Sequence, residues 1–279
     1  TLCPMRHLKP ALYVFALNVI ISIYLQLNNV LLGFMKDTEA VGYFTAATKI
    51  MVITMSISSA LGAVIMPRTS NLIAEERMDE FKALVQKSYD FIFALAMPLM
   101  VGLIFTSPSA VLLLSGEGFV PAILTSQIVA FNILTVGLSG VMGIQVLYPL
   151  GKINIVILCT SIGAIINVFL NVLLIPRYGH NGTAVAYMLA EMTVTVSMFF
   201  IGKRYIPIRF LKRQHLNYVL GSVVMGVCLY FISWLGLGNT ATLVMMISMG
   251  GIVYVVILLF LRDSIGMIPW KILREKFGK

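Results

Sequence analysis

Two charged residues lie far inside long apolar stretches of this sequence, Lys49 and Glu191. A charge in a lipid environment costs about 2.5–3.5 kcal/mol, so each one needs a reason. Lys49 follows Gly42 by seven residues and Glu191 follows Thr183 by eight, which places them roughly 10 and 12 Å along their helices. The two could form an ion pair, or Lys49 could extend outward to water. Alternatively, Lys49 faces a water-filled cavity and attracts an anionic substrate, with Glu191 as its partner or as a proton carrier.

Amide side chains form a second group of candidates. Gln26, Asn28 and Asn29 cluster near one end of the first apolar stretch, where they could bind sugar hydroxyls. Amides also commonly join helices by hydrogen bonds within membranes. Both interpretations stay open for each of these residues. Asp90, only two residues into its apolar stretch, is interpreted as a carboxylate at the membrane interface.

A proline in the third apolar stretch predicts a bend. Pro98 lies ten residues into that stretch, and Gly102 follows it by four residues. Proline removes a helical hydrogen bond and kinks the helix. The kink could be static, or it could be a hinge that bends during a transport cycle.

Motifs for enzymatic chemistry are absent from the sequence. It contains no GxxxxGK[ST] phosphate loop and no HExxH pair. His7, His180 and His215 lie in three separate connections, and three cysteines cannot form a paired disulfide framework. We therefore expect no catalytic cluster, no metal site, no cofactor and no enzymatic activity.

The composition indicates that membrane helices position these candidates. Of the 279 residues, 59% are hydrophobic and 11% are charged, whereas a soluble domain carries about 25% charge. This excludes a water-soluble enzyme and predicts an all-α, polytopic integral membrane protein. A span needs about 20 apolar residues. Eight such spans are predicted: Pro10–Phe34, Tyr43–Met66, Ser88–Leu114, Ala122–Tyr148, Ile153–Ile175, Thr183–Gly202, Leu216–Leu237 and Ala241–Leu261.

The basic residues alternate between the connections. Seventeen of the 20 basic residues fall in alternate connections and the two ends, and only Lys36 and Arg177 fall in the opposite connections. This distribution is typical of the positive-inside rule. It predicts a multi-pass protein of the cell membrane with both termini in the cytoplasm. The net charge of +9 is thereby explained by topology, so we expect no nucleic-acid partner.

The segments between and beyond the spans complete the predicted organisation. Residues 1–9 form a cytoplasmic end, 10–205 a six-helix lobe, 206–261 an additional helix pair and 262–279 a basic cytoplasmic tail. Within the lobe, the spacing of apolar residues in 71–87 predicts an amphipathic helix along the inner interface. Because the sequence opens on Thr1 without an initiator Met, we expect a preceding N-terminal portion.

Several segments resemble polysaccharide exporters of the multidrug/oligosaccharidyl-lipid/polysaccharide (MOP, MATE-like) superfamily, the group of O-antigen and capsule repeat-unit flippases. The segments that carry the resemblance are Asn28–Gly33, Val41–Ile50, Ala60–Arg68, Gly116–Phe119, Ile166–Gly179 and Gly182–Glu191. The family implies a two-lobed transporter of fourteen helices. Spans one to six resemble its second, C-terminal lobe, and the last two resemble its extra helix pair. The N-terminal lobe is then missing from this chain.

The resemblance also implies a function and a site. A member of this family moves undecaprenyl-diphosphate-linked oligosaccharide repeat units across the cytoplasmic membrane for cell-surface polysaccharide biosynthesis, alongside glycosyltransferases and a polymerase. Related lipid II flippases carry a cation at the position resembling Lys49, which would attract the diphosphate, while Gln26 and Asn28 would contact sugars. Many members have Asp where this chain has Asn28, and an amide cannot titrate.

Two alternative functions are also compatible with the sequence. A multidrug or cation antiporter of the same superfamily would need acidic residues in its cleft, and Glu191 is the only deep carboxylate. A membrane-embedded polyprenyl-linked sugar transferase or polymerase would need a cluster of acidic, histidine or arginine side chains at one membrane face, and the outer connections carry few of these.

Overall fold

The computed structural model describes residues 12, 15, 19, 22, 26–205, 209, 212–236 and 238–261, with side chains for all of these except 57–61 and 63. Within these residues every regular element is a helix, which confirms the predicted all-α fold. The predicted ends at 1–9 and 262–279, and much of the first predicted span, lie outside the described residues.

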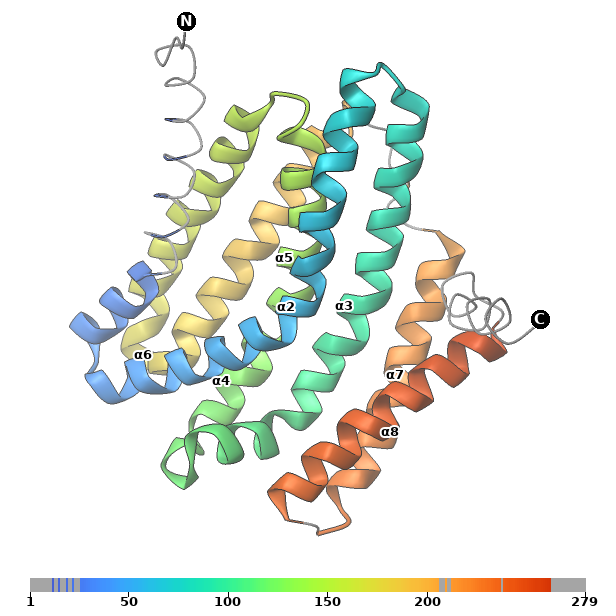
Figure 1. The fold of residues 1–279 in the computed structure, drawn as a ribbon. Coiled ribbons are helices and arrows are strands. Elements are labelled where there is room, and N and C mark those ends of the chain that lie inside the picture. Colours follow the sequence, from blue (N-terminus) through green and yellow to red (C-terminus); the bar gives the residue numbers. More distant parts are fainter. Residues whose placement is uncertain are drawn as a thin grey trace, which may run out of the picture.

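The helices follow one another along the chain with short connections (Figure 1). Helical residues 12, 15, 19, 22 and 26–35 come first. The elements after them are α2 (Thr38–Ala74), α3 (Met78–Ser115), the short 3₁₀ turn η1 (Glu117–Phe119), α4 (Ala122–Val129), α5 (Phe131–Gly140), the π-helical η2 (Val141–Leu147), α6 (Ile153–Gly202), α7 (Arg213–Ser233) and α8 (Asn239–Phe260).

Helix α6 contains two of the predicted spans. Its 50 residues would extend about 75 Å if straight, more than twice the ~30 Å hydrocarbon thickness. Gly179 interrupts the helix with φ +54° and ψ −131°, a left-handed conformation that glycine adopts without strain. A Cβ on Gly182 would lie 2.6 Å from the carbonyl oxygen of Leu174, so the chain reverses tightly here and returns alongside itself.

The amphipathic helix predicted over 71–87 does not form as one element. Helix α2 continues to Ala74, and α3 begins at Met78. Between them Arg77 binds the carboxylates of Glu75 and Glu80, each at 2.8 Å, and this turn breaks the helical path. The apolar residues that suggested an interfacial helix point into the protein instead, as the complete burial of Phe81 shows.

Helix α3 lies at the centre of the bundle (Figure 1). It packs against α2, α4 and α5 on one side and against the α7–α8 pair on the other. We call the end of the bundle with the turns at 75–77 and 148–152 the basic end, and the end with the turns at 36–37, 116–121 and Gly179 the opposite end. The buried core has three parts: one towards the opposite end around Ile133, one towards the basic end around Phe81, and one between α3, α7 and α8 around Tyr218.

The outer surface is apolar, as expected for helices surrounded by lipid. Phe231 and Phe260, for example, are 67% and 87% exposed, and such large side chains rarely gather on the surface of a soluble monomer. By length and composition, five helical stretches among the described residues suffice to cross a membrane: Met78–Ser115, Ala122–Leu147, Ile153–Gly202, Arg213–Ser233 and Asn239–Phe260. The chain is thus a polytopic membrane protein, and the total of eight spans stays a prediction.

Candidate functional site

Lys49 lies on an exposed stripe of α2. Its side chain is exposed, as are those of Val52 and Ile53 farther along the same helix. Among the residues that the structure describes, no ion pair includes Lys49. As far as the described part of the chain is concerned, the amine is available to an anion from outside. Because residues four apart share a helix face, Lys49 lies one turn from Ile53 on the same side of α2.

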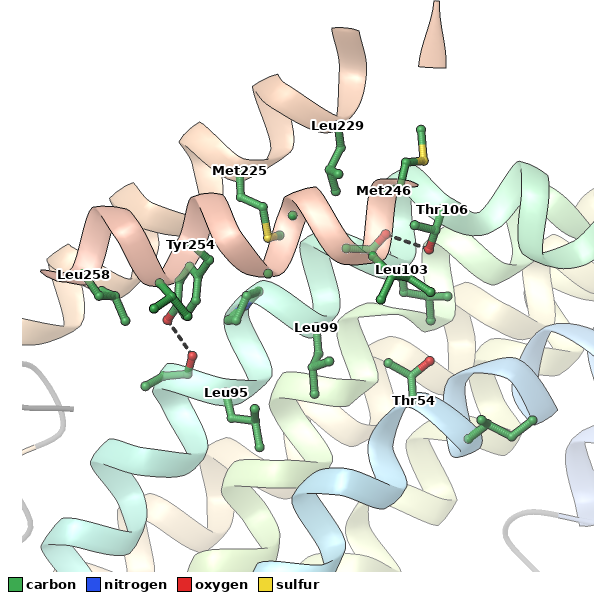
Figure 2. A pocket seen from close by; sticks show the side chains of 18 of the residues that line it. Thr54, Leu95, Leu99, Leu103, Thr106, Met225, Leu229, Met246, Tyr254 and Leu258 are labelled. Carbon is green, nitrogen blue, oxygen red and sulfur yellow. Dashed lines mark hydrogen bonds between the residues drawn. The ribbon is translucent and has the colours of Figure 1, made fainter. Parts of the chain in front are cut away.

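Ile53 belongs to the wall of an apolar pocket of about 660 Å³. Most of the lining residues come from α3 and α8. Helix α7 contributes Met225 and Leu229, and α2 contributes Ile53 and Thr54. Figure 2 shows Leu95, Leu99 and Leu103 of α3 on one side and side chains of α7 and α8 on the other. These lining side chains from α7 and α8 include Met225, Leu229, Met246, Tyr254 and Leu258.

The three hydroxyl groups in the pocket wall are all used by the protein itself. Thr54 donates to the carbonyl of Ile50 at 3.0 Å, and Thr106 donates to that of Gly102 at 2.8 Å. Tyr254 of α8 donates to the carbonyl of Ala94 at 2.5 Å (Figure 2). With these donors already paired, the wall offers a ligand mainly hydrocarbon contact. The pocket therefore suits an apolar chain rather than a sugar or an ion.

Pro98 and Gly102, the predicted hinge residues, both line this pocket. Pro98 lies inside α3 and has no N–H to give to the carbonyl of Ala94, four residues earlier. That carbonyl is the one that Tyr254 binds. The structure thus places the predicted hinge against the pocket, and the hinge motion itself stays a prediction.

The predicted sugar-binding amides occupy different surroundings. Gln26 is exposed. Asn28 is 1% exposed, and its Oδ1 accepts a hydrogen bond of 2.8 Å from Nδ2 of Asn171. Asn171 Nδ2 also reaches Asn167 Oδ1 at 3.1 Å. In this conformation Asn28 therefore joins the first described helix to α6, while Gln26 is accessible to a ligand.

Glu191 is buried in the second half of α6, with 9% of its surface exposed. The structure shows no ion pair between Glu191 and Lys49, so these two candidates are not brought together here. Among the described residues, no group of three or more His, Cys, Asp or Glu side chains could hold a metal ion.

A cluster near the basic end was not predicted from the sequence. The carboxylate of Asp90 in α3 accepts hydrogen bonds from Lys212 Nζ at 2.6 Å and from Gln86 Nε2 at 2.8 Å. His215 Nε2 of α7 lies 3.0 Å from the same carboxylate. The short distance of Asp90 from the predicted membrane boundary was the available signal, but nothing local identifies partners more than 120 residues away.

Comparison with known proteins connects these features to a family. Residues 6–124 match a family profile described as polysaccharide biosynthesis protein. The chain is 24% identical over 237 residues to a probable low-salt glycan biosynthesis flippase, Agl15, of Haloferax volcanii. This match covers 85% of the chain and 50% of that relative. The chain is also 21% identical over 173 residues to the membrane protein MJ1068 of Methanocaldococcus jannaschii. This second match covers 62% of the chain and 34% of MJ1068.

The fold is shared with a solved transporter. The chain superposes on the lipid II flippase MurJ in its inward closed conformation with a TM-score of 0.77 at 17% identity. The superposition covers 90% of this chain and 53% of that flippase. The chain thus spans about half the length of Agl15 and of MurJ, and about a third of MJ1068. Together, these comparisons confirm the predicted resemblance to polysaccharide-biosynthesis proteins and glycan flippases: residues 6–124 resemble the family profile, and the chain is a polytopic membrane protein with the fold of a solved flippase.

Proposed function

We propose that this chain is part of a flippase that moves undecaprenyl-diphosphate-linked oligosaccharide repeat units across the cytoplasmic membrane for cell-surface polysaccharide biosynthesis. The observation that carries the proposal is the position of Lys49. It presents an exposed cation that makes no ion pair with any described residue, one helical turn from an apolar pocket of about 660 Å³. A lipid-linked sugar diphosphate has both an anionic group and a long hydrocarbon chain, and this site has a complement for each.

The diphosphate and the lipid chain of such a substrate would bind to successive residues along α2 and into the pocket. The diphosphate would lie at Lys49, and the adjoining isoprene units would pass Ile53 into the pocket between α3 and α8. Burying hydrocarbon there contributes about 0.8 kcal/mol per CH₂ group. Gln26, which is exposed in helical residues 26–35, would contact sugar hydroxyls. Asn28 would also contact them once its hydrogen bond to Asn171 breaks.

The charge distribution supports an orientation for this transport. The turns at the basic end carry Arg77, Lys152 and Lys203, whereas the turns at the opposite end carry few cations. By the positive-inside rule the basic end and both termini are cytoplasmic. The substrate would enter from that side after glycosyltransferases have built it. It would leave on the other side, where a polymerase consumes it.

A cleft for the sugar requires a second lobe. The matched residues make up only 50% and 53% of the two relatives, and we place a missing N-terminal lobe opposite the exposed stripe of α2. The two lobes would then rock around Lys49 in alternating access, with α3 bending at Pro98 and Gly102. Glu191 would serve as a proton carrier that biases this motion.

Reconstitution of the full-length protein in liposomes tests the proposal. A fluorescent undecaprenyl-diphosphate-linked oligosaccharide is supplied, and its translocation is followed by quenching from outside. We expect Lys49→Ala to abolish translocation while the protein stays folded, and Lys49→Arg to keep a measurable rate because it keeps the charge. Lys36→Ala, which removes an exposed cation at the opposite end, is the matched control and should transport normally.

Other outcomes would contradict the assignment. Normal translocation by Lys49→Ala would remove Lys49 from the substrate site. Failure of the wild-type protein to move the lipid, together with proton-driven efflux of a cationic dye that Glu191→Gln abolishes, would favour a cation antiporter of the same superfamily.

A further inference from the structure

Helix α3 contains two prolines, and each leaves one backbone carbonyl without its helical partner. Proline has no N–H, so the carbonyl four residues earlier loses its donor. Pro98 releases the carbonyl of Ala94, and Pro108 releases that of Ile104. A buried carbonyl without a donor destabilises the protein, so both need a donor from elsewhere in the fold.

Side chains from two different helices supply these donors. The hydroxyl of Tyr254 in α8 lies 2.5 Å from the carbonyl oxygen of Ala94. Nε2 of Gln127 in α4 lies 3.2 Å from that of Ile104. Ala94 and Tyr254 are only 4% and 8% exposed, so water has little access to the first of these bonds.

The two bonds differ in what they hold together. Gln127 joins α3 to α4, within the lobe and away from the pocket lining. Tyr254 joins α3 to α8 across one end of the apolar pocket (Figure 2). The ring reaches α3 because Gly221 of α7 leaves room for it: a Cβ on Gly221 would lie 3.1 Å from Tyr254 Cε2.

We propose that Tyr254 is a positioning residue that couples the width of the apolar pocket to the bend in α3. Its hydroxyl occupies the carbonyl that Pro98 releases, so α8 can move away from α3 only by leaving that carbonyl unpaired. The bond holds the pocket walls at the spacing seen here, and its breakage accompanies widening of the pocket and a change of bend at Pro98. Only the consequence for lipid transport rests on the proposed function.

A double-mutant cycle on the full chain in detergent tests this coupling without any substrate. Tyr254→Phe removes the hydroxyl and keeps the ring, and it should lower the melting temperature by about 2–4 °C. Pro98→Ala restores an N–H that can pair with the Ala94 carbonyl. In the Pro98→Ala background, Tyr254→Phe should therefore lower the melting temperature by less than half of its effect in the wild-type background. Pro98→Gly supplies the same N–H and serves if the alanine variant does not fold.

Equal drops in melting temperature in both backgrounds would overturn the proposal, because the hydroxyl would then act independently of the proline. No drop from Tyr254→Phe alone would also overturn it, because the hydroxyl would then contribute nothing to stability. Hydrogen–deuterium exchange separates positioning from general stability. Tyr254→Phe should accelerate amide exchange along α8. Gln127→Leu, which removes the matched donor at Pro108, should leave α8 exchange unchanged. Equal acceleration of α8 exchange by the two variants would contradict the assigned role.

Transport then gives a further readout. Tyr254→Phe should raise the concentration of lipid-linked oligosaccharide needed for half-maximal translocation, and Gln127→Leu should not. An unchanged half-maximal concentration in Tyr254→Phe would contradict the link to transport. Because the melting and exchange measurements involve no lipid substrate, failure of the flippase assignment would leave their result intact and distinguishable.

Discussion

The imidazole of His215 in α7 lies 3.0 Å from the carboxylate of Asp90 in α3, with only 2% of the histidine side chain exposed. His215 Nδ1 accepts a hydrogen bond from the backbone N–H of Lys212 at 3.2 Å, so Nε2 carries the ring hydrogen and donates a hydrogen bond to Asp90. The ring also stacks on Phe93, with ring centroids 4.7 Å apart. These contacts fix the first turn of α7 on α3 and thereby hold one wall of the apolar pocket.

Removal of this carboxylate should destabilise the protein. Asp90→Ala leaves Lys212 and His215 without their acceptor in a largely buried position, and we expect a loss of about 2–3 kcal/mol in the free energy of unfolding. Asp79→Ala is the matched control, because Asp79 pairs with Lys82 while 99% exposed. It should change stability by less than about 0.5 kcal/mol. Denaturation of the purified variants measures both, and similar losses would contradict the assigned difference.

Stability should depend on pH through His180 at the opposite end. Thr125 donates its hydroxyl to Asn181 Oδ1 at 2.8 Å, so its lone pair accepts from His180 Nδ1, also at 2.8 Å. Burial is the main cause that lowers the pKa of His180 below its ordinary value of 6.5. As the pH falls below 6.5, the unfolded chain binds a proton at this residue before the folded chain does.

The free energy of unfolding should therefore decrease as the pH is lowered from about 7.5 towards 5.5. In His180→Gln this decrease should be smaller, because the titrating group is gone. Melting curves over this pH range provide the measurement. An identical pH dependence in the variant would show that other groups cause it.

The tight reversal at Gly179–Gly182 should tolerate no added side chain. In Gly182→Ala the new Cβ would meet the backbone oxygen of Leu174 at 2.6 Å, and we expect a loss of about 1–3 kcal/mol in stability. Gly140→Ala is the matched helical control, since no atom lies within 4 Å of its Cβ position. It should stabilise the helix by about 0.5–1 kcal/mol. A neutral Gly182→Ala would indicate that this turn is looser than the structure shows.

Filling the apolar pocket should reduce transport without unfolding the protein. Gly251 lines the pocket, and no atom lies within 4 Å of a Cβ placed on it. Gly251→Leu would displace part of a bound hydrocarbon chain. The loss of about two buried CH₂ groups corresponds to roughly a tenfold weaker interaction. Flipping in liposomes measures the effect, with Gly140→Leu as a control outside the pocket. Equal flipping rates in both variants would show that the pocket does not contribute to transport.

The helical, membrane-spanning architecture follows from local features of the sequence. Runs of apolar residues predicted the helices, and the predicted gap between the spans that end at Ile175 and begin at Thr183 contains Gly179, where α6 turns. Pro98 predicted a bend in α3 because a missing N–H is a property of the residue itself. The amphipathic pattern in 71–87 was interpreted wrongly, since periodicity shows that a face is buried but not whether lipid or protein covers it.

The composition of the candidate site depends on how distant helices cross. Tyr254 meets Ala94 across 160 residues, and His215 meets Asp90 across 125. Each missing donor or acceptor can be recognised from its own segment, but the side chain that pairs with it is selected by helix packing. For the same reason the charge of Lys49 was evident from the sequence, whereas its exposure beside an apolar pocket, and the burial of Asn28 against Asn171, arise from the packing of α2, α3, α6 and α8.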